Sequence, residues 1–337
     1  MEAGDRWLGA RLVRGRATDP PIDRAAAEAE VNAIPADASA VTRRGQRGIM
    51  VATTVVPFAA VVTAIYLLWD SAVGPADLAL LGVFYVLCAL GITVGFHRML
   101  THRAFQAHPA LRAVLLVLGS MAVQGDAIGW AIDHREHHAH SDQDGDPHSP
   151  HAGFASGIVG QFRGLLHAHV GWMFDHERAA DRRHWAKDLL EDPIIRFVDR
   201  TFVIWAALGL ALPFAIGGLL GGWHGALTGL LWGGLVRMFI GHHVTWSINS
   251  ICHVFGRRPF TANDQSTNNW LLALPSLGES WHHNHHVFPS SAYHGFGRQL
   301  DISGMCISAF ERVGLATNVR RITDQQRARK RGARDAR

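Results

Sequence analysis

The sequence predicts an all-α integral membrane protein with four transmembrane helices arranged as two hairpins. Three observations indicate this fold: long uncharged stretches, a low share of charged residues, and arginines gathered at one side of those stretches. Of the 337 residues, 48% are hydrophobic and only 18% are charged, whereas soluble domains average about 25% charged residues. Interfacial helices are expected to accompany the four spans.

Four stretches of the chain are predicted to cross the membrane. They span residues 49–69, 78–96, 202–222 and 225–246. A helix needs about 20 apolar residues to cross the hydrocarbon core of a bilayer, and the first three stretches reach that length without a charge. The fourth contains Arg237, which forms an ion pair inside the bundle or extends toward the membrane surface.

A fifth apolar stretch, residues 113–123, is too short to cross the membrane. Its length favours a re-entrant or interfacial helix. A soluble protein with buried core helices is the alternative for the whole chain. Three separate uncharged runs of spanning length make a membrane protein the better interpretation.

The basic residues predict the orientation. They precede the first and third stretches and follow the second and fourth, and the connecting turns at 70–77 and 221–224 contain neither Lys nor Arg. The basic residues are Arg43, Arg44, Arg47, Arg98, Arg103, Arg112, Arg196, Arg200, Arg257 and Arg258. Because Lys and Arg collect on the cytoplasmic side, both termini and the long middle segment are expected in the cytoplasm.

The chain is predicted to contain one folded domain, residues 46–319. Residues 1–45 read as a disordered leader without the apolar core of a signal peptide, and residues 320–337 read as a basic disordered tail. The net charge is +4, but the basic residues flank apolar stretches, which favours a membrane surface over nucleic acid. The three cysteines form no CxxC pair, which argues against a zinc ribbon, an iron–sulfur cluster or a disulfide framework.

Histidine is the most unusual residue, with 22 copies. Two clusters, His134-Arg-Glu-His-His138 and His282-His-Asn-His-His286, place histidines at i, i+3 and i+4, which lie on one face of a helix. Asn249 and His253 are also four apart. His97 and His102 are five apart, which suits a helix end or a local distortion. All four groups lie at predicted cytoplasmic ends.

Nine imidazoles are therefore available to bind metal. They are His97, His102, His134, His137, His138, His253, His282, His285 and His286. One metal takes four to six ligands, so nine indicate two metals; imidazole suits Zn, Cu, Fe and Ni alike. A lone histidine is more often structural, but four groups at one membrane face are poorly explained by chance.

The motifs resemble those of membrane fatty acid desaturases, specifically acyl-CoA delta-9 (stearoyl-CoA) desaturases of a bacterial, actinobacterial-like type. They are HRMLTH (97–102), DHREHH (133–138), DGDPHSP (144–150), TWSINSICH (245–253) and GESWHHNHHVFP (278–289). The resemblance implies that the nine histidines bind two irons and that Asn249 holds a metal-bound water. It also implies a cytoplasmic helical cap over the four transmembrane helices, a bent acyl tunnel and a location in the bacterial inner membrane.

One position departs from the family pattern. Relatives carry Asn after the first histidine of the last cluster, where this chain has His283. His283 is therefore predicted to support the ligands or to compete with them. His140 lies beyond the usual cluster and is predicted to support the ligands or to be structural. Asp133 and Glu279 are candidates for orienting imidazole N–H groups, or for capping and solvated roles. No catalytic residue is predicted beyond the metal centre.

The resemblance implies an enzyme that uses O2 and two external electrons to introduce a cis double bond, at delta-9, into stearoyl- or palmitoyl-CoA. The electrons need a separate NAD(P)H-dependent reductase or small electron carrier, because the chain has no His-Pro-Gly-Gly haem motif and no GxGxxG fingerprint. An acyl-lipid desaturase and a fatty acid hydroxylase are alternatives. A histidine-rich metal transporter fits less well, because its ligands should lie near the membrane midplane.

Overall fold

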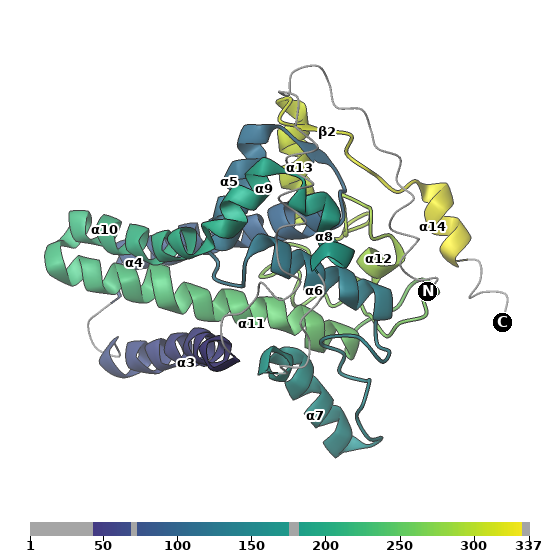
Figure 1. The fold of residues 1–337 in the computed structure, drawn as a ribbon, viewed down its shortest axis with the longest axis horizontal. Coiled ribbons are helices and arrows are strands. Elements are labelled where there is room, and N and C mark those ends of the chain that lie inside the picture. Colours follow the sequence, from purple (N-terminus) through teal and green to yellow (C-terminus); the bar gives the residue numbers. More distant parts are fainter. Residues whose placement is uncertain (1–42, 69–72, 175–181, 332–337) are drawn as a thin grey trace.

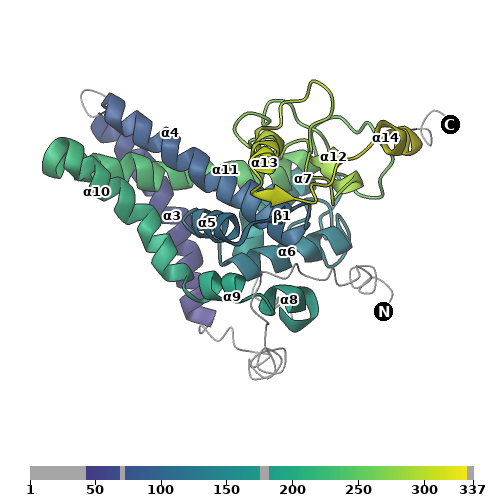
Figure 2. The same ribbon diagram turned by 90° about the horizontal axis from the view of Figure 1, so that it is seen from above.

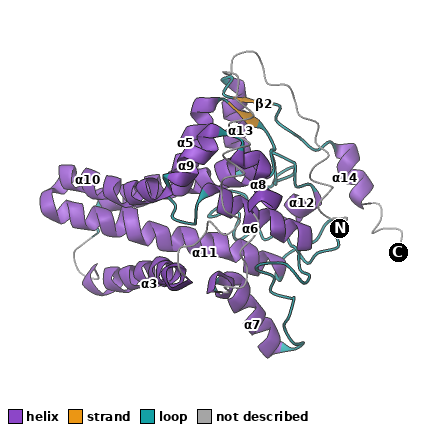
Figure 3. Ribbon diagram, in the orientation of Figure 1, coloured by secondary structure: helices purple, strands orange, loops and turns teal. Residues whose placement is uncertain are grey.

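The protein is mostly helical, with long apolar helices at one end and a cap of short helices at the other (Figures 1 and 3). The computed structural model describes residues 43–68, 73–174 and 182–331. Residues 1–42 of the expected leader and 332–337 of the expected tail lie outside the described residues. Large apolar side chains are exposed along the long helices and also on parts of the cap, among them Ile158 and Phe162 of the segment 158–169.

The long helices coincide with the stretches predicted to cross the membrane. They are α3 (Arg43–Leu68), α4 (Pro75–Leu90) with its continuation η1 (Gly91–Thr101), α10 (Phe202–Gly229), η3 (Leu230–Val236) and α11 (Arg237–Ser250). Among the described residues, two continuous helical stretches are long and apolar enough to cross a membrane, Pro75–Thr101 and Phe202–His253. The apolar part of α3, Met50–Ala64, is shorter.

The 52-residue stretch Phe202–His253 folds back on itself. The backbone leaves helical geometry at Gly221 and Gly222, where Gly222 has φ 61°, a conformation that glycine adopts without strain. The two arms then pack closely, since a Cβ added to Gly217 would lie 2.1 Å from the carbonyl oxygen of Gly225. The reversal falls within the predicted turn at 221–224.

Arg237 holds this hairpin to its neighbour. Its guanidinium is buried and donates to the backbone carbonyls of Gly233, Met121 and Gly209 at 3.2, 2.9 and 2.8 Å. The partners are therefore carbonyl dipoles rather than the carboxylate that an ion pair would supply. Burial of the charged group is offset by these hydrogen bonds.

Helix α5 (Pro109–Ser120) corresponds to the short apolar stretch. It lies against η1 at a backbone contact: a Cβ added to Gly91 would lie 2.1 Å from the amide nitrogen of Gly119. Glycine at both positions permits this approach. Leu111, Leu115 and Leu116 of α5 are buried in the main hydrophobic core.

The cap consists of short helices joined by long loops. They are α6 (Ala127–His140), α7 (Ile158–His169), η2 (Gly171–Phe174), α8 (Arg182–Leu190), α9 (Pro193–Arg200), η4 (Ile251–His253), α12 (His282–Val287), α13 (Ile302–Arg312) and α14 (Asp324–Arg331). Strands β1 (Gln106–Ala107) and β2 (Ala316–Thr317) pair antiparallel. Helix α14 lies in the segment for which the sequence predicted no structure. The views in Figures 1 and 2 place α14 and the tips of α4 and α10 at opposite ends of the molecule.

Asp126 fixes the start of α6, the helix that carries three of the candidate ligands. Its carboxylate accepts from the Gly129 amide at 2.8 Å, an N-cap interaction typical of Asp. The amide of Ile128 donates to the Asp199 carboxylate at 2.9 Å, which ties α6 to α9. The register of the α6 histidines is therefore set from both sides.

Candidate metal centre

Histidines from η1, α6, η4 and α12 meet inside the cap. Their ring nitrogens form two groups, and within each group the potential ligand atoms lie within 4.8 Å of one another. The first group is His97, His102, His134, His138 and His285, and the second group is His137, His253, His282 and His286. The nine histidines singled out from the sequence are thus brought together in sets of five and four.

The first group converges through its Nε2 atoms. His134 Nε2 lies 2.9 Å from His97 Nε2, 3.0 Å from His102 Nε2 and 3.1 Å from His138 Nε2. His285 Nε2 lies 3.1 Å from His97 Nε2 and 2.8 Å from His138 Nε2. With metal–nitrogen bonds of about 2.1 Å, ligands at right angles lie about 3.0 Å apart. The spacing matches imidazoles arranged around one ion.

The second group converges in the same way. His282 Nε2 lies 3.0 Å from His253 Nε2 and 3.0 Å from His286 Nε2, and His286 Nε2 lies 3.3 Å from His137 Nε2. His137 and His138 are neighbours on α6 but belong to different groups. The two groups are therefore adjacent.

A π-helix accounts for the five-residue spacing of His97 and His102. η1 has i→i+5 hydrogen bonding, and the His102 amide donates to the His97 carbonyl at 3.1 Å. Residues five apart then stand one above the other, and the two rings lie 4.8 Å apart, centroid to centroid. π-Helical turns occur frequently at functional sites. The sequence predicted a helix end or a local distortion at His97 and His102, and the structure has a π-helix over Gly91–Thr101.

Carboxylates contact the outward-facing Nδ1 atoms of the second group. The pairs are His137 with Asp146, His253 with Asp142, and His286 with Asp264, each at 2.9 Å. An ionised carboxylate only accepts hydrogen bonds, so each Nδ1 carries the proton. Each Nε2 then points a lone pair at the centre of its group.

These lone pairs test whether the residues fit a metal. His137 Nε2 and His286 Nε2 lie 3.3 Å apart, and a ring whose single proton is on Nδ1 has none to share at Nε2. Burial, and then the neighbouring His282, lower the pKa of His286 well below its usual value, so this ring is neutral at physiological pH. Two lone pairs facing each other repel unless a cation lies between them. The donor set therefore fits a metal ion bound by imidazole.

Glu279 contacts the first group. Its Oε2 lies 2.6 Å from His97 Nδ1 and 3.2 Å from His294 Nδ1, and its Oε1 lies 2.9 Å from a guanidinium nitrogen of Arg98. Burial would raise the pKa of Glu279, but Arg98, His294 and His97 hold it well below its usual value. Arg98 is itself fully buried and also pairs with Asp301 at 2.9 Å. Glu279 is therefore an anion that can orient His97.

The other sequence-predicted candidates lie elsewhere. His283 faces away from both groups: its Nε2 lies 3.1 Å from the Phe260 carbonyl oxygen and its Nδ1 lies 3.2 Å from Ser266 Oγ. His140 contacts Gly145 and belongs to neither group. Asp133 is half-buried on α6, and its role stays a prediction.

Sequence reasoning missed most of the carboxylates. Asp142, Asp146 and Asp264 lie in loops, His294 received no role, and Arg98 was assigned only to the basic residues that predict the orientation. The motif DGDPHSP, which contains Asp146, was noticed without a role for its carboxylates. Its position, immediately after a histidine-bearing helix, was the available signal.

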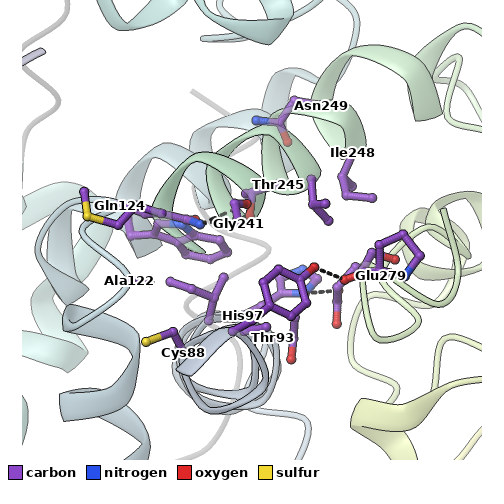
Figure 4. A pocket seen from close by; sticks show the side chains of 18 of the residues that line it. Cys88, Thr93, His97, Ala122, Gln124, Gly241, Thr245, Ile248, Asn249 and Glu279 are labelled. Carbon is purple, nitrogen blue, oxygen red and sulfur yellow. Dashed lines mark hydrogen bonds and ion pairs between the residues drawn. The ribbon is translucent and has the colours of Figure 1, made fainter. Parts of the chain in front are cut away.

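An apolar cavity reaches both histidine groups, and Figure 4 shows His97 of the first group among its lining residues. The cavity is narrow, with a volume of about 70 Å³. Side chains from α4, η1 and α11 form most of the wall, and His97, His134 and His282 lie at the histidine end. Asn249 of α11 also lines this cavity. An apolar chain in this cavity would lie beside two potential metal sites.

Comparison with known proteins supports this arrangement. The model of the family described as fatty acid desaturase matches residues 73–302. The chain belongs to the fatty acid desaturase family. It is thus an oxidoreductase of lipid metabolism, and its histidine groups are consistent with a di-iron centre.

Three similar desaturase-family proteins differ in their named substrates. A hex-5-enoyl-[acyl-carrier protein] acetylenase of Moorena producens (strain JHB) is 42% identical over 79% of this chain and 84% of its own length. An sn-1 stearoyl-lipid 9-desaturase of Anabaena variabilis is 40% identical over 71% of this chain and 81% of its own. An acyl-CoA C20 Delta5-desaturase of Anemone leveillei is 38% identical over 70% of this chain and 71% of its own.

Proposed function

We propose that this protein is an oxygen-dependent di-iron desaturase that introduces a cis double bond at delta-9 of stearoyl- or palmitoyl-CoA. The observation that supports this proposal is the apolar cavity whose end is formed by His97, His134 and His282. Because these residues come from both histidine groups, a saturated chain in the cavity would lie beside both metals.

The nine grouped histidines would hold the two irons, with Asn249 contributing through a water. When bound, the irons would activate O2, which could then oxidise an unactivated chain by removing two hydrogens. The protein positions the chain and excludes water. The balanced reaction is R–CH2–CH2–R′ + O2 + 2 e⁻ + 2 H⁺ giving R–CH=CH–R′ + 2 H2O.

Hydrogen bonds between the cavity walls fix its shape. The hydroxyl of Tyr85 on α4 donates to the carbonyl of Pro275, and the Gln124 side-chain amide donates to Thr245 Oγ1 on α11 at 3.0 Å. All four residues line the cavity. A wall held from several sides restricts which carbons reach the histidine end, which is what selection of one C–C bond requires.

We also propose four membrane spans in the bacterial inner membrane, with both termini and the histidine groups on the cytoplasmic side. The hairpin reversal at Gly221 and Gly222 supports two antiparallel arms within Phe202–His253. The arginines beside the spans support the orientation.

The test is product analysis with the iron-loaded full chain, O2, a reductant and a donor protein. Stearoyl chains are offered as the CoA thioester, the acyl carrier protein thioester and the lipid ester, and mass spectrometry locates the new bond. We expect octadec-9-enoyl-CoA, and none from His134→Ala. A hydroxylated product would contradict this proposal and indicate a hydroxylase. Oxidation of the lipid ester alone would indicate an acyl-lipid desaturase, the alternative that the name of the Anabaena relative favours.

A further inference from the structure

A second cavity reaches the histidine groups from a different direction. It is lined by polar residues of the loop after α6 and of residues 261–264, and it reaches His138 and His286. His138 belongs to the first group and His286 to the second. None of its lining residues lines the apolar cavity. The candidate metal centre therefore has two separate approaches.

The lining of the second cavity is unsuited to an acyl chain. Ser141, Gln143, Asn263 and Asp264 contribute polar groups, and their desolvation by a hydrocarbon would be unfavourable. Asp264 contacts His286 Nδ1 at 2.9 Å. The approach is thus polar up to an imidazole of the second group.

Helix α14 forms one side of this approach. Lys330 lines the cavity, and its carbonyl accepts from the Thr261 amide at 3.4 Å. The guanidinium of Arg327 lies 5.0 Å from the centre of the Phe296 ring, and that of Arg331 lies 5.4 Å from the centre of the Phe260 ring. These cation–π contacts hold the helix against the cap.

The exposed side of α14 is strongly basic. The sequence DQQRARKR contains four basic residues and one acidic residue. The acidic residue is Asp324, which pairs with Arg327. Arg329, Lys330 and Arg331 are exposed. A single-sign surface of this kind attracts an oppositely charged partner and speeds its association.

The position of α14 decides between two anionic partners. Figures 1 and 2 place α14 at the end of the molecule opposite to the tips of α4 and α10. Those helices contain the stretches long and apolar enough to cross a membrane. The lipid surface at these tips therefore lies at the other end of the molecule from α14, and a soluble acidic protein can reach α14 from the cap side.

We propose that the exposed face of α14, with Arg329, Lys330 and Arg331, docks a small acidic one-electron carrier protein over the polar cavity. This inference rests on the proposed function. Each docked carrier is oxidised by one electron, which enters at the His286 side, and two carriers supply the two electrons of one turnover. The polar cavity gives the required protons a path that avoids the acyl chain.

The experiment measures binding and activity separately. A plant-type [2Fe–2S] ferredoxin serves as the acidic probe, and its affinity for the iron-loaded full chain in nanodiscs is titrated at low and high salt. Lys330→Glu and Arg329→Glu are compared with Arg312→Glu, an exposed basic residue on α13 that changes the net charge equally.

We expect each α14 variant to weaken ferredoxin binding at least fivefold at low salt and much less at high salt. Arg312→Glu should change it less than twofold, and dithionite-driven single turnovers should be unaffected in Arg329→Glu and Arg312→Glu. Equal effects of the three variants, or an effect on acyl carrier protein binding instead of ferredoxin binding, would overturn the docking proposal. Normal salt-dependent docking without any double bond would overturn the proposed function and leave the docking face intact.

Discussion

The two histidine groups differ in what holds their outer ring nitrogens. In the second group, three of four Nδ1 atoms contact carboxylates, those of Asp146, Asp142 and Asp264. In the first group, His97 contacts Glu279, which is shared with Arg98 and His294. The buried Nδ1 atoms of His102 and His285 have no hydrogen-bond partner among the described residues.

This difference predicts unequal metal sites. A carboxylate on Nδ1 fixes the tautomer and makes the imidazole a stronger ligand. Its negative charge also favours a bound cation. Glu279 and Asp301 share the positive charge of Arg98, which offsets part of the charge of Glu279, so this one carboxylate adds less to the first group than three carboxylates add to the second. We therefore expect the second group to bind iron more tightly and the first group to release it first.

Removing one ligand from each group should have the largest effect. His102→Ala and His253→Ala should each lower the rate of desaturation more than about 100-fold. Loss of a residue that only hydrogen-bonds to a metal ligand usually lowers activity or metal affinity about 10- to 100-fold. Each should retain about one iron per chain. The iron retained by His102→Ala should resist a chelator longer than that retained by His253→Ala, measured by iron analysis over time. Equal or reversed rates would contradict unequal sites.

The helical spacing predicted which histidines meet but left their partition open. At 3.6 residues per turn, residue i+4 is rotated by about 40° from residue i, and residue i+3 by about 60° in the opposite direction. On α6, His134 and His138 accordingly enter the first group and His137 the second. On α12, His282 and His286 enter the second group and His285 the first. Each of these two helices therefore contributes histidines to both groups.

The supporting carboxylates needed the tertiary structure. Asp142 lies 111 residues from His253 in the sequence and is 2.9 Å from its Nδ1. No local periodicity encodes such a contact, because both residues lie outside regular α-helix. The long helices were predictable from apolar length alone, whereas the π-helix η1 was signalled only by the odd spacing of His97 and His102.

A substitution at Asp264 should have an intermediate effect. Asp264→Asn removes the charge beside His286, and we expect about tenfold weaker iron binding by the second group. This is the lower end of the usual range, because the amide oxygen can still accept from Nδ1. Chelator competition measures the change.

The matched control is Asp192→Asn. Asp192 caps α9 and pairs with Arg112, away from both groups, and Asn also caps helices well. Its iron retention should equal that of the unmodified protein. If Asp264→Asn behaves like this control, the carboxylates do not distinguish the two groups.

The smallest effect should come from His283, although it lies within the last histidine cluster. His283→Asn should leave two irons per chain and change desaturation less than about twofold, because this ring contacts Phe260 and Ser266 instead of either group. Loss of its buried hydrogen bonds should lower the free energy of unfolding by about 1 kcal/mol, seen as a small decrease in Tm.

The matched control is the same substitution one residue earlier. His282→Asn should lose iron, because His282 Nε2 lies 3.0 Å from the Nε2 atoms of both His253 and His286. Loss of iron from His283→Asn would mean that the second group reaches beyond its four histidines.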